Sequence, residues 1–297
     1  MARRHPVLRG VAIFVVVVLG LAALVIGVAA LGEGPLGERF TFGNTVAVVE
    51  VRGVITDAAD TVEALDRLRQ HDATVGVVLR VDSPGGAVAP SQEMYDAVWR
   101  LRAARKPVVA SLGNVAASGG YYVASAADVV VADPGTLTGS IGAIMEVHNV
   151  ASLAEKLGVS QTVVKSGRFK DVGQPLRPMT DEERVLLQRM VDDVLGQFVD
   201  AVARGRGMEA GRVRALADGR LYSGAQAREA GLVDELGGLA EATRIAWTRG
   251  GQTGEPRVSH VRAHSRPWWL ELLGIAHLPD LGAPGGLLFL YRGPLPG

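Results

Sequence analysis

Hydrophobic and polar positions divide the chain into regions of different pattern. Residues 10–32 are apolar without interruption, whereas residues 44–250 alternate between short apolar runs and amphipathic stretches. From residue 251 to 297 the pattern weakens into apolar pieces separated by Pro and Gly. We therefore expect an N-terminal segment (1–9), a membrane span (10–32), a linker (33–43), a main domain and a C-terminal tail.

The run at residues 10–32 carries no charge. At about 1.5 Å per residue a helix of this length crosses a hydrocarbon core of about 30 Å. A cleavable signal peptide is the alternative, although its apolar region is normally about 7–15 residues long. Arg3, Arg4 and Arg9 precede the run, so we expect a cytoplasmic N-terminus, with the main domain on the other side of the membrane.

The main domain has strand and helix patterns in alternation. Near-continuous apolar strands separated by helices predict an α/β fold with a parallel sheet and helical crossovers. Capping boxes at Thr180–Glu183 and Ser223–Gln226 mark two helix starts. The predicted strands are 45–51, 75–81, 107–112, 128–132 and 160–164, and the predicted helices are 61–69, 91–102, 121–126, 150–157, 180–204, 223–231 and 239–247.

Composition narrows the possible functions. Lys plus Arg and Asp plus Glu both number 31, so there is no basic excess of the kind that a nucleic-acid partner usually requires. The chain has no cysteine, which excludes disulfides and thiol catalysis. His260 and His264 are four residues apart in a polar stretch, and we expect no metal site there.

Three glycine-bearing turns each follow a predicted strand. They are Ser83-Pro84-Gly85-Gly86, Ser118-Gly119-Gly120 and Thr138-Gly139-Ser140-Ile141-Gly142. Turns at the carboxyl ends of parallel strands gather at one edge of the sheet, where their N–H groups can form an oxyanion hole. Ser118 has small residues on both sides, which suits an exposed nucleophile and also an ordinary tight turn.

A nucleophilic serine needs a base. His148 is the one histidine in the middle of the domain and has no evident partner. Lys170 lies in the polar loop Lys165–Pro178, and a lysine that acts as a base must be desolvated to lose its proton. Taken alone, such a lysine is more often a solvated surface charge.

Four segments resemble those of the bacterial signal peptide peptidases of the serine/lysine type: VDSPGG (81–86), NVAASGGYYVA (114–124), TLTGSIG (136–142) and KSGRFKD (165–171). The resemblance implies a Clp/crotonase-like spiral of β-β-α units. It also implies that Ser118 is the nucleophile and Lys170 the general base, that Ser140 orients the lysine, and that Gly119 and Gly86 form the oxyanion hole.

The resemblance further implies a homo-oligomer in which neighbouring subunits supply the serine and the lysine of one site. It requires no cofactor, and it predicts a single-pass protein of the bacterial cell membrane that cleaves remnant signal peptides. Three alternatives stay open: a protease of a membrane-protein partner, a crotonase-like acyl-CoA enzyme and a non-catalytic scaffold. For the tail we expect packing on the domain or on a neighbouring subunit, with membrane contact through Trp268 and Trp269 as the alternative.

Overall fold

The computed structural model describes Gly20, residues 43–261 and residues 288–290. The chain divides into two compact units, and the division falls between Gly43 and Asn44, at the end of the predicted linker. Among the described residues, no helix has the length and apolar character needed to cross a membrane. The predicted span at 10–32 lies outside the described residues, apart from Gly20.

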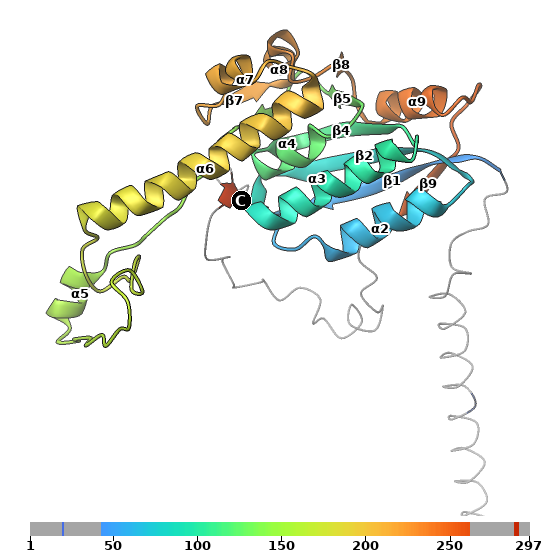
Figure 1. The fold of residues 1–297 in the computed structure, drawn as a ribbon. Helices are drawn as coiled ribbons and strands as arrows, with labels where there is room; N and C mark the ends of the chain where they lie inside the picture. The colour runs from blue at the N-terminus through green and yellow to red at the C-terminus, as the bar shows by residue number, and fades with distance from the viewer. Residues whose placement is uncertain (1–19, 21–42, 262–287, 291–297) are drawn as a thin grey trace, which may run out of the picture. The chain divides into compact units, whose positions relative to one another are not determined.

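A mainly parallel sheet forms the centre of the second unit (Figure 1). Its strand order is β7-β6-β4-β2-β1-β9, and β5 pairs with both β4 and β8 beside this path. The pairing of β7 with β6 is antiparallel, and the other pairings of this sheet are parallel. The strands are β1 (Thr45–Arg52), β2 (Thr74–Ser83), β4 (Val108–Ala117), β5 (Val129–Ala132), β6 (Leu137–Gly139), β7 (Leu221–Ser223), β8 (Glu235–Leu236) and β9 (Val258–Val261).

Helices cover both faces of the sheet because its strands are apolar on both sides. In β1, Val49 belongs to one buried cluster and Val48 to the other, since successive side chains of a strand point to opposite faces. The first cluster includes side chains of α2 (Ala59–Gln70), α3 (Val88–Ala103) and α4 (Gly119–Ala124). The second is closed by α9 (Leu239–Arg249) through Ala242, Ala246 and Trp247.

The long helix α6 (Asp181–Arg206) extends beyond the sheet (Figure 1). Near its C-terminal end Phe198 is fully buried in the core, whereas Met190 is 46% exposed. α5 (Ala151–Lys156) and the loop that follows it lie at the far end of α6. We call residues 150–190 the arm. Two more helices, α7 (Ala210–Leu216) and α8 (Gly224–Ala230), follow α6 and complete this side of the unit.

The predicted strand at Ser160–Val164 is wrong. These residues form no strand, and the side chain of Val164 is almost wholly exposed. They lie in the arm, where no strand of the sheet is available to pair with them. Branched side chains favour a strand mainly through packing against neighbours, so their presence alone does not create one.

The other predicted strands and helices are confirmed, with ends that shift by a few residues. The largest change is in β4, which continues past the predicted end at Leu112 to Ala117. Both predicted capping boxes are present, on α6 and α8. The pattern gives no prediction for the short strands β6 to β9, because so few residues show no clear period. β9 lies beyond residue 250, yet it pairs with β1 in the main sheet.

A second, two-stranded sheet lies beside the first. β3 (Gly85–Ala87) pairs in antiparallel fashion with β10 (Leu288–Leu290), and Phe289 is opposite Gly86. α4 contacts both of these strands. A segment from the region of the predicted tail therefore pairs with the glycine turn that follows β2.

Candidate active site

Ser118 occupies a sharp turn between β4 and α4. Its φ of 53° and ψ of −119° lie in a region that side chains other than glycine rarely adopt. Such a conformation costs roughly 1–3 kcal/mol and persists only where the surroundings impose it. A strained serine between a strand and a helix is the arrangement that presents a nucleophile in α/β hydrolases.

Backbone contacts hold this turn on both sides. The Ser118 N–H donates to the Gly139 carbonyl at 2.8 Å, and the Ser118 carbonyl accepts from the Tyr122 N–H at 2.8 Å. Gly120 is needed for packing, since a Cβ there would lie 2.8 Å from the Ser83 carbonyl oxygen. The turn is therefore fixed by the strands beside it.

Two tyrosines anchor α4 in the core. The Tyr121 hydroxyl donates to the Leu232 carbonyl at 2.8 Å, and the Tyr122 ring lies 5.0 Å from the rings of both Tyr95 and Phe198. Burial raises the pKa of Tyr121 and raises the pKa of Tyr122 to about 12. Both tyrosines therefore stay protonated at neutral pH, and they support the serine helix without acting as bases.

Ser140 lies beside Ser118 because β6 pairs with the end of β4, with Gly139 opposite Ala117. It too has a positive φ, of 49°, and its N–H donates to the Arg220 carbonyl at 2.9 Å. Two threonine hydroxyls tie β6 and the turn before it to β4. Thr136 donates to the Gly113 carbonyl at 2.8 Å, and Thr138 donates to the Ala116 carbonyl at 2.6 Å. Neither threonine was among the predicted site residues.

A bulge in β4 brings its end to the site. The register against β2 shifts between Val81, which faces Leu112, and Ser83, which faces Ala116. The Asp82 carboxylate accepts from the Val115 N–H at 3.1 Å and fills the space beside Gly113, where a Cβ would lie 2.7 Å from the Asp82 Cγ. The bulge explains why β4 is longer than its apolar run predicts.

Ser118 and Ser140 line one cavity of about 520 Å³. Much of its lining comes from segments remote in sequence, including Leu195 of α6 and Asp218 after α7. These residues belong to no motif, and only the folded chain brings them to the serine. The other lining residues are Gly142, Ala143, Ile144, Glu146, Ala217 and Gly219.

Lys170 does not line this cavity. It is an exposed residue of the arm, and its N–H donates to the Gly167 carbonyl at 3.2 Å within a turn. His148 is also exposed and lies outside the cavity lining. A single chain thus brings Ser118 and Ser140 to one cavity and leaves the predicted base outside its lining, in the loop between α5 and α6. This loop lies at the end of α6 that is farthest from the sheet (Figure 1).

The two predicted oxyanion donors have different surroundings. Gly119 is the first residue of α4, directly after Ser118. In β3, the Gly85 carbonyl accepts from the Ile55 N–H at 2.9 Å, and the Ala87 N–H donates to the Ile55 carbonyl at 2.7 Å. Alternate groups of a strand point to opposite sides, so the Gly86 N–H faces β10. A Cβ at Gly86 would lie 2.0 Å from the Ile55 oxygen, so packing alone requires glycine here.

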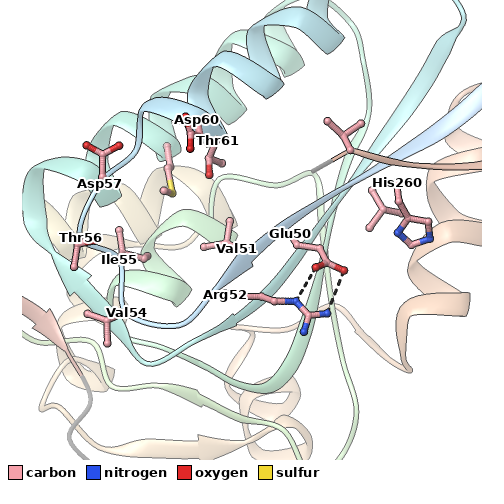
Figure 2. Close-up of a pocket in the computed structure, with 13 residues that line it drawn as sticks. Glu50, Val51, Arg52, Val54, Ile55, Thr56, Asp57, Asp60, Thr61 and His260 are labelled. Carbon is pink, nitrogen blue, oxygen red and sulfur yellow. Dashed lines mark hydrogen bonds and ion pairs between the residues drawn. The ribbon is translucent and has the colours of Figure 1, made fainter. Parts of the chain in front are cut away.

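A larger cavity of about 750 Å³ lies where β1 leads into α2 (Figure 2). Figure 2 shows the Glu50 carboxylate paired with Arg52, at 2.7 Å from Nε to Oε2, with His260 of β9 nearby. Its lining residues include no serine and no lysine. Among the described residues, no group of three His, Asp or Glu side chains is placed to hold a metal ion. We therefore place the candidate active site at the smaller cavity.

A strained serine at the edge of a mainly parallel α/β sheet is typical of serine hydrolases. Residues 100–249 match the model of peptidase family S49, which is half of the chain and includes Ser118, Ser140 and Lys170. The chain belongs to peptidase family S49 and is a serine-type peptidase. This confirms the resemblance noted in the sequence, and it argues against an acyl-CoA enzyme.

Three relatives are each similar to about two thirds of this chain. "Putative protease slr0021" of Synechocystis is 42% identical over 69% of this chain and 74% of its own length. "Putative signal peptide peptidase SppA" of Enterococcus faecium is 37% identical over 67% of this chain and 62% of its own. "Protease 4" of Haemophilus influenzae is 33% identical over 70% of this chain and 35% of its own. The chain thus spans less than two thirds of the second and third relatives.

One solved structure, the S97A mutant of the 1510-N membrane-bound stomatin-specific protease, aligns with a TM-score of 0.45 and 16% identity. The alignment covers 74% of this chain and 98% of that chain.

Proposed function

We propose that the protein is a membrane-anchored serine endopeptidase in which Ser118 is the nucleophile and Lys170 the general base. Its substrates would be remnant signal peptides or other short hydrophobic peptides. The observation that carries the proposal is the strained turn that holds Ser118 beside Ser140 in one cavity. Family membership and the relative named as a signal peptide peptidase support the reaction class.

The mechanism follows the template of serine acyl transfer with a lysine as the base. Neutral Lys170 takes the proton of the Ser118 hydroxyl, and the serine oxygen attacks the peptide carbonyl. The Gly119 N–H stabilises the oxyanion, and the Gly86 N–H, which faces β10 in the single chain, joins it once β10 leaves the edge of β3. Protonated Lys170 then gives its proton to the leaving amine, and water hydrolyses the acyl-enzyme. Ser140 accepts or donates a hydrogen bond at the lysine and keeps its amine directed at Ser118.

We further infer that Lys170 reaches Ser118 of a neighbouring subunit. Two features support this arrangement. Lys170 is exposed on the arm and absent from the lining of the cavity of its own chain. The arm also exposes large apolar side chains, among them Leu153 at 55% and Leu157 at 70%. Apolar surface of this kind usually marks a protein interface, and a second copy covering the arm would desolvate the lysine there.

The preference for hydrophobic peptides has support at two points of the chain. Ala143, Ile144 and Leu195 give the cavity beside Ser118 an apolar part of the lining. The uncharged run at residues 10–32 would hold the domain at the membrane, where apolar peptides accumulate. Localisation at the bacterial cell membrane, with the domain outside the cytoplasm, is part of the same proposal.

The test is hydrolysis of signal-derived peptides by the full chain in detergent. Ser118→Ala and Lys170→Met should each lower kcat/KM by at least about 1,000-fold, because each removes a group that acts in the chemical step. Ser166→Ala and Lys156→Met are matched controls on the arm and should keep full activity. Hydrolysis at the wild-type rate by either of the first two variants would refute the proposed mechanism.

A further inference from the structure

A connected cluster of charged side chains surrounds the residue that follows Lys170. The Lys165 Nζ lies 2.5 Å from Oδ1 of Asp171, and the Arg177 Nε lies 3.2 Å from Oδ2 of the same carboxylate. Arg177 also donates to the Asp171 backbone carbonyl at 3.2 Å. Asp171 is therefore held through its side chain and its main chain by two cations of the same loop.

The same arginine reaches the start of α6. Its Nη1 lies 2.8 Å from Oε2 of Glu183, and its Nη2 contacts Oε1, so the guanidinium binds this carboxylate with two parallel hydrogen bonds. Glu183 is also part of the capping box of α6, since its carboxylate accepts from the Thr180 N–H at 2.9 Å. Arg177 thus joins the loop of Lys170 to the first turn of a helix.

The carboxylates that Arg177 binds are largely buried, whereas much of the arm is exposed to solvent. The side chains of Glu183 and Asp171 are only 5% and 11% exposed, whereas the residues from 157 to 170 are all exposed. The described loop has no helix or strand of its own between α5 and α6. Another ion pair from loop to helix, Arg168 with Glu182, has both side chains exposed and constrains the loop less.

α6 continues the connection to the serine. Its residue Phe198 packs against Tyr122 of α4, at 5.0 Å between ring centroids, and α4 begins directly after Ser118. The cluster around Arg177 therefore fixes the lysine loop to the same helix that packs on the serine helix. In an oligomer built from such chains, this fixed geometry determines where each lysine enters a neighbouring site.

We propose that Arg177 is a positioning residue for Lys170. By binding Asp171 and Glu183 together, it holds the loop so that the lysine amine reaches its working position. This inference rests on the proposed function, since it assumes that Lys170 is the general base. Arg177 would then act without contacting the substrate, and its loss would affect catalysis only through Lys170.

The test compares Arg177→Met with Arg100→Met in the full chain in detergent. Arg100 makes a similar two-bond pair with Asp66, at 3.1 and 2.9 Å, between α3 and α2. Because a displacement of about 1 Å at a catalytic group can cost about 100-fold in rate, Arg177→Met should lower kcat by a factor of that order. KM should change little in Arg177→Met, and Arg100→Met should resemble the wild type.

A second measurement follows the loop without using activity. The chain has no cysteine, so Ser166→Cys provides a single site for a nitroxide spin label on the lysine loop. The label should become more mobile when Arg177→Met is added and should not change when Arg100→Met is added. Glu183→Gln removes the charge that Arg177 binds but keeps an acceptor for the helix cap. It should also lower kcat and mobilise the label, even if Arg177→Met does not fold.

The outcomes separate this inference from the proposed function. Wild-type kcat in Arg177→Met, together with an inactive Lys170→Met, would refute the positioning role and leave the dyad intact. An active Lys170→Met would refute the dyad itself. A smaller oligomer in Arg177→Met, measured by light scattering, would mean that the cluster serves assembly, and the positioning role would be wrong.

Discussion

At the scale of single residues, Ser118 has a backbone conformation that suits its proposed role as nucleophile but lowers the stability of the folded chain. Its positive φ is imposed by the contacts with Gly139 and Tyr122, which hold the turn from both sides. At Gly86, by contrast, the structure explains the residue type by packing. The close approach of Ile55 explains its glycine without any reference to catalysis, so a side chain added there cannot test the oxyanion role.

Ser118→Gly should be more stable than Ser118→Ala. Glycine adopts the observed φ and ψ without the strain that any Cβ causes, and the gain should be about 1 kcal/mol, partly offset by the greater freedom of glycine in the unfolded chain. Urea unfolding of the two inactive variants would measure the difference. Equal midpoints, or a more stable alanine variant, would contradict this expectation, because the strain that glycine relieves would then not exceed the cost of its greater freedom in the unfolded chain.

At the scale of elements, β3 has hydrogen-bonded neighbours on both of its edges, Ile55 on one edge and β10 on the other. Its outer edge is covered by β10, opposite the residue that the sequence predicts as an oxyanion donor. Extended peptides commonly bind proteins by adding a strand to a free sheet edge. In this chain that edge at Gly85–Ala87 is already paired, so a peptide that binds along β3 must first displace β10.

Deleting residues 288–297 should therefore speed the hydrolysis of short peptides, mainly through a lower KM, because the edge of β3 becomes free for the substrate. The comparison is a chain of equal length in which these residues are replaced by a Gly/Ser sequence, which should behave like the deletion. A loss of activity in both would indicate that β10 supports the site, and unchanged kinetics would indicate that peptides do not use this edge.

At the scale of the whole molecule, the arm separates the two members of the proposed dyad within one chain. The apolar core ends near Phe198 on α6, and the lysine loop lies beyond it, attached through Arg177 and Glu183. Under the proposed mechanism a second copy is required for catalysis, so activity and assembly should depend on one another.

Mixing inactive subunits tests this dependence. If serine and lysine come from neighbouring chains, equal amounts of Ser118→Ala and Lys170→Met should regain activity at about one quarter of the sites after subunits exchange. A dyad within one chain would give no regain at any ratio. The control is the same mixture after chemical crosslinking of each variant, which prevents exchange and should stay inactive.

Two carboxylates that are hydrogen-bonded to cationic side chains also make the stability of the molecule depend on pH. Hydrogen bonds from Lys165 and Arg177 lower the pKa of Asp171 to about 2, and those from Arg177 lower the pKa of Glu183 to about 2. Groups with a lowered pKa stabilise the folded state above the unfolded-state values of about 4, and this stabilisation is lost as the pH falls toward 2. The midpoint of urea unfolding should therefore decrease between pH 5 and 3.

Glu183→Gln removes one of these titrating groups and should reduce that decrease, while Lys156→Met, on α5 and not a member of the cluster, should leave it unchanged. A midpoint that stays constant from pH 5 to pH 3 in the wild type would contradict the assignment.

The sequence by itself determined the order of the longer elements, because apolar runs and caps depend on local pattern. The boundaries of α6 and α8 follow from Thr180 and Ser223, whose side chains act within one turn. The four motifs also identified the family, since their residue types and order are specific. The sequence failed at Ser160–Val164, where branched residues lacked a neighbouring strand, and in the long β4, whose bulge depends on Asp82.

The tertiary structure alone decided which of the site residues meet. Pairing of β6 with β4 brings Ser140 to Ser118, and chain folding adds Leu195 and Asp218 to their cavity. It also placed Lys170 on the arm and joined Arg177 to Glu183. Apart from the pair of Arg177 and Glu183, which are six residues apart, these arrangements depend on contacts between residues far apart in the chain, and such contacts leave no periodic or local trace in the sequence.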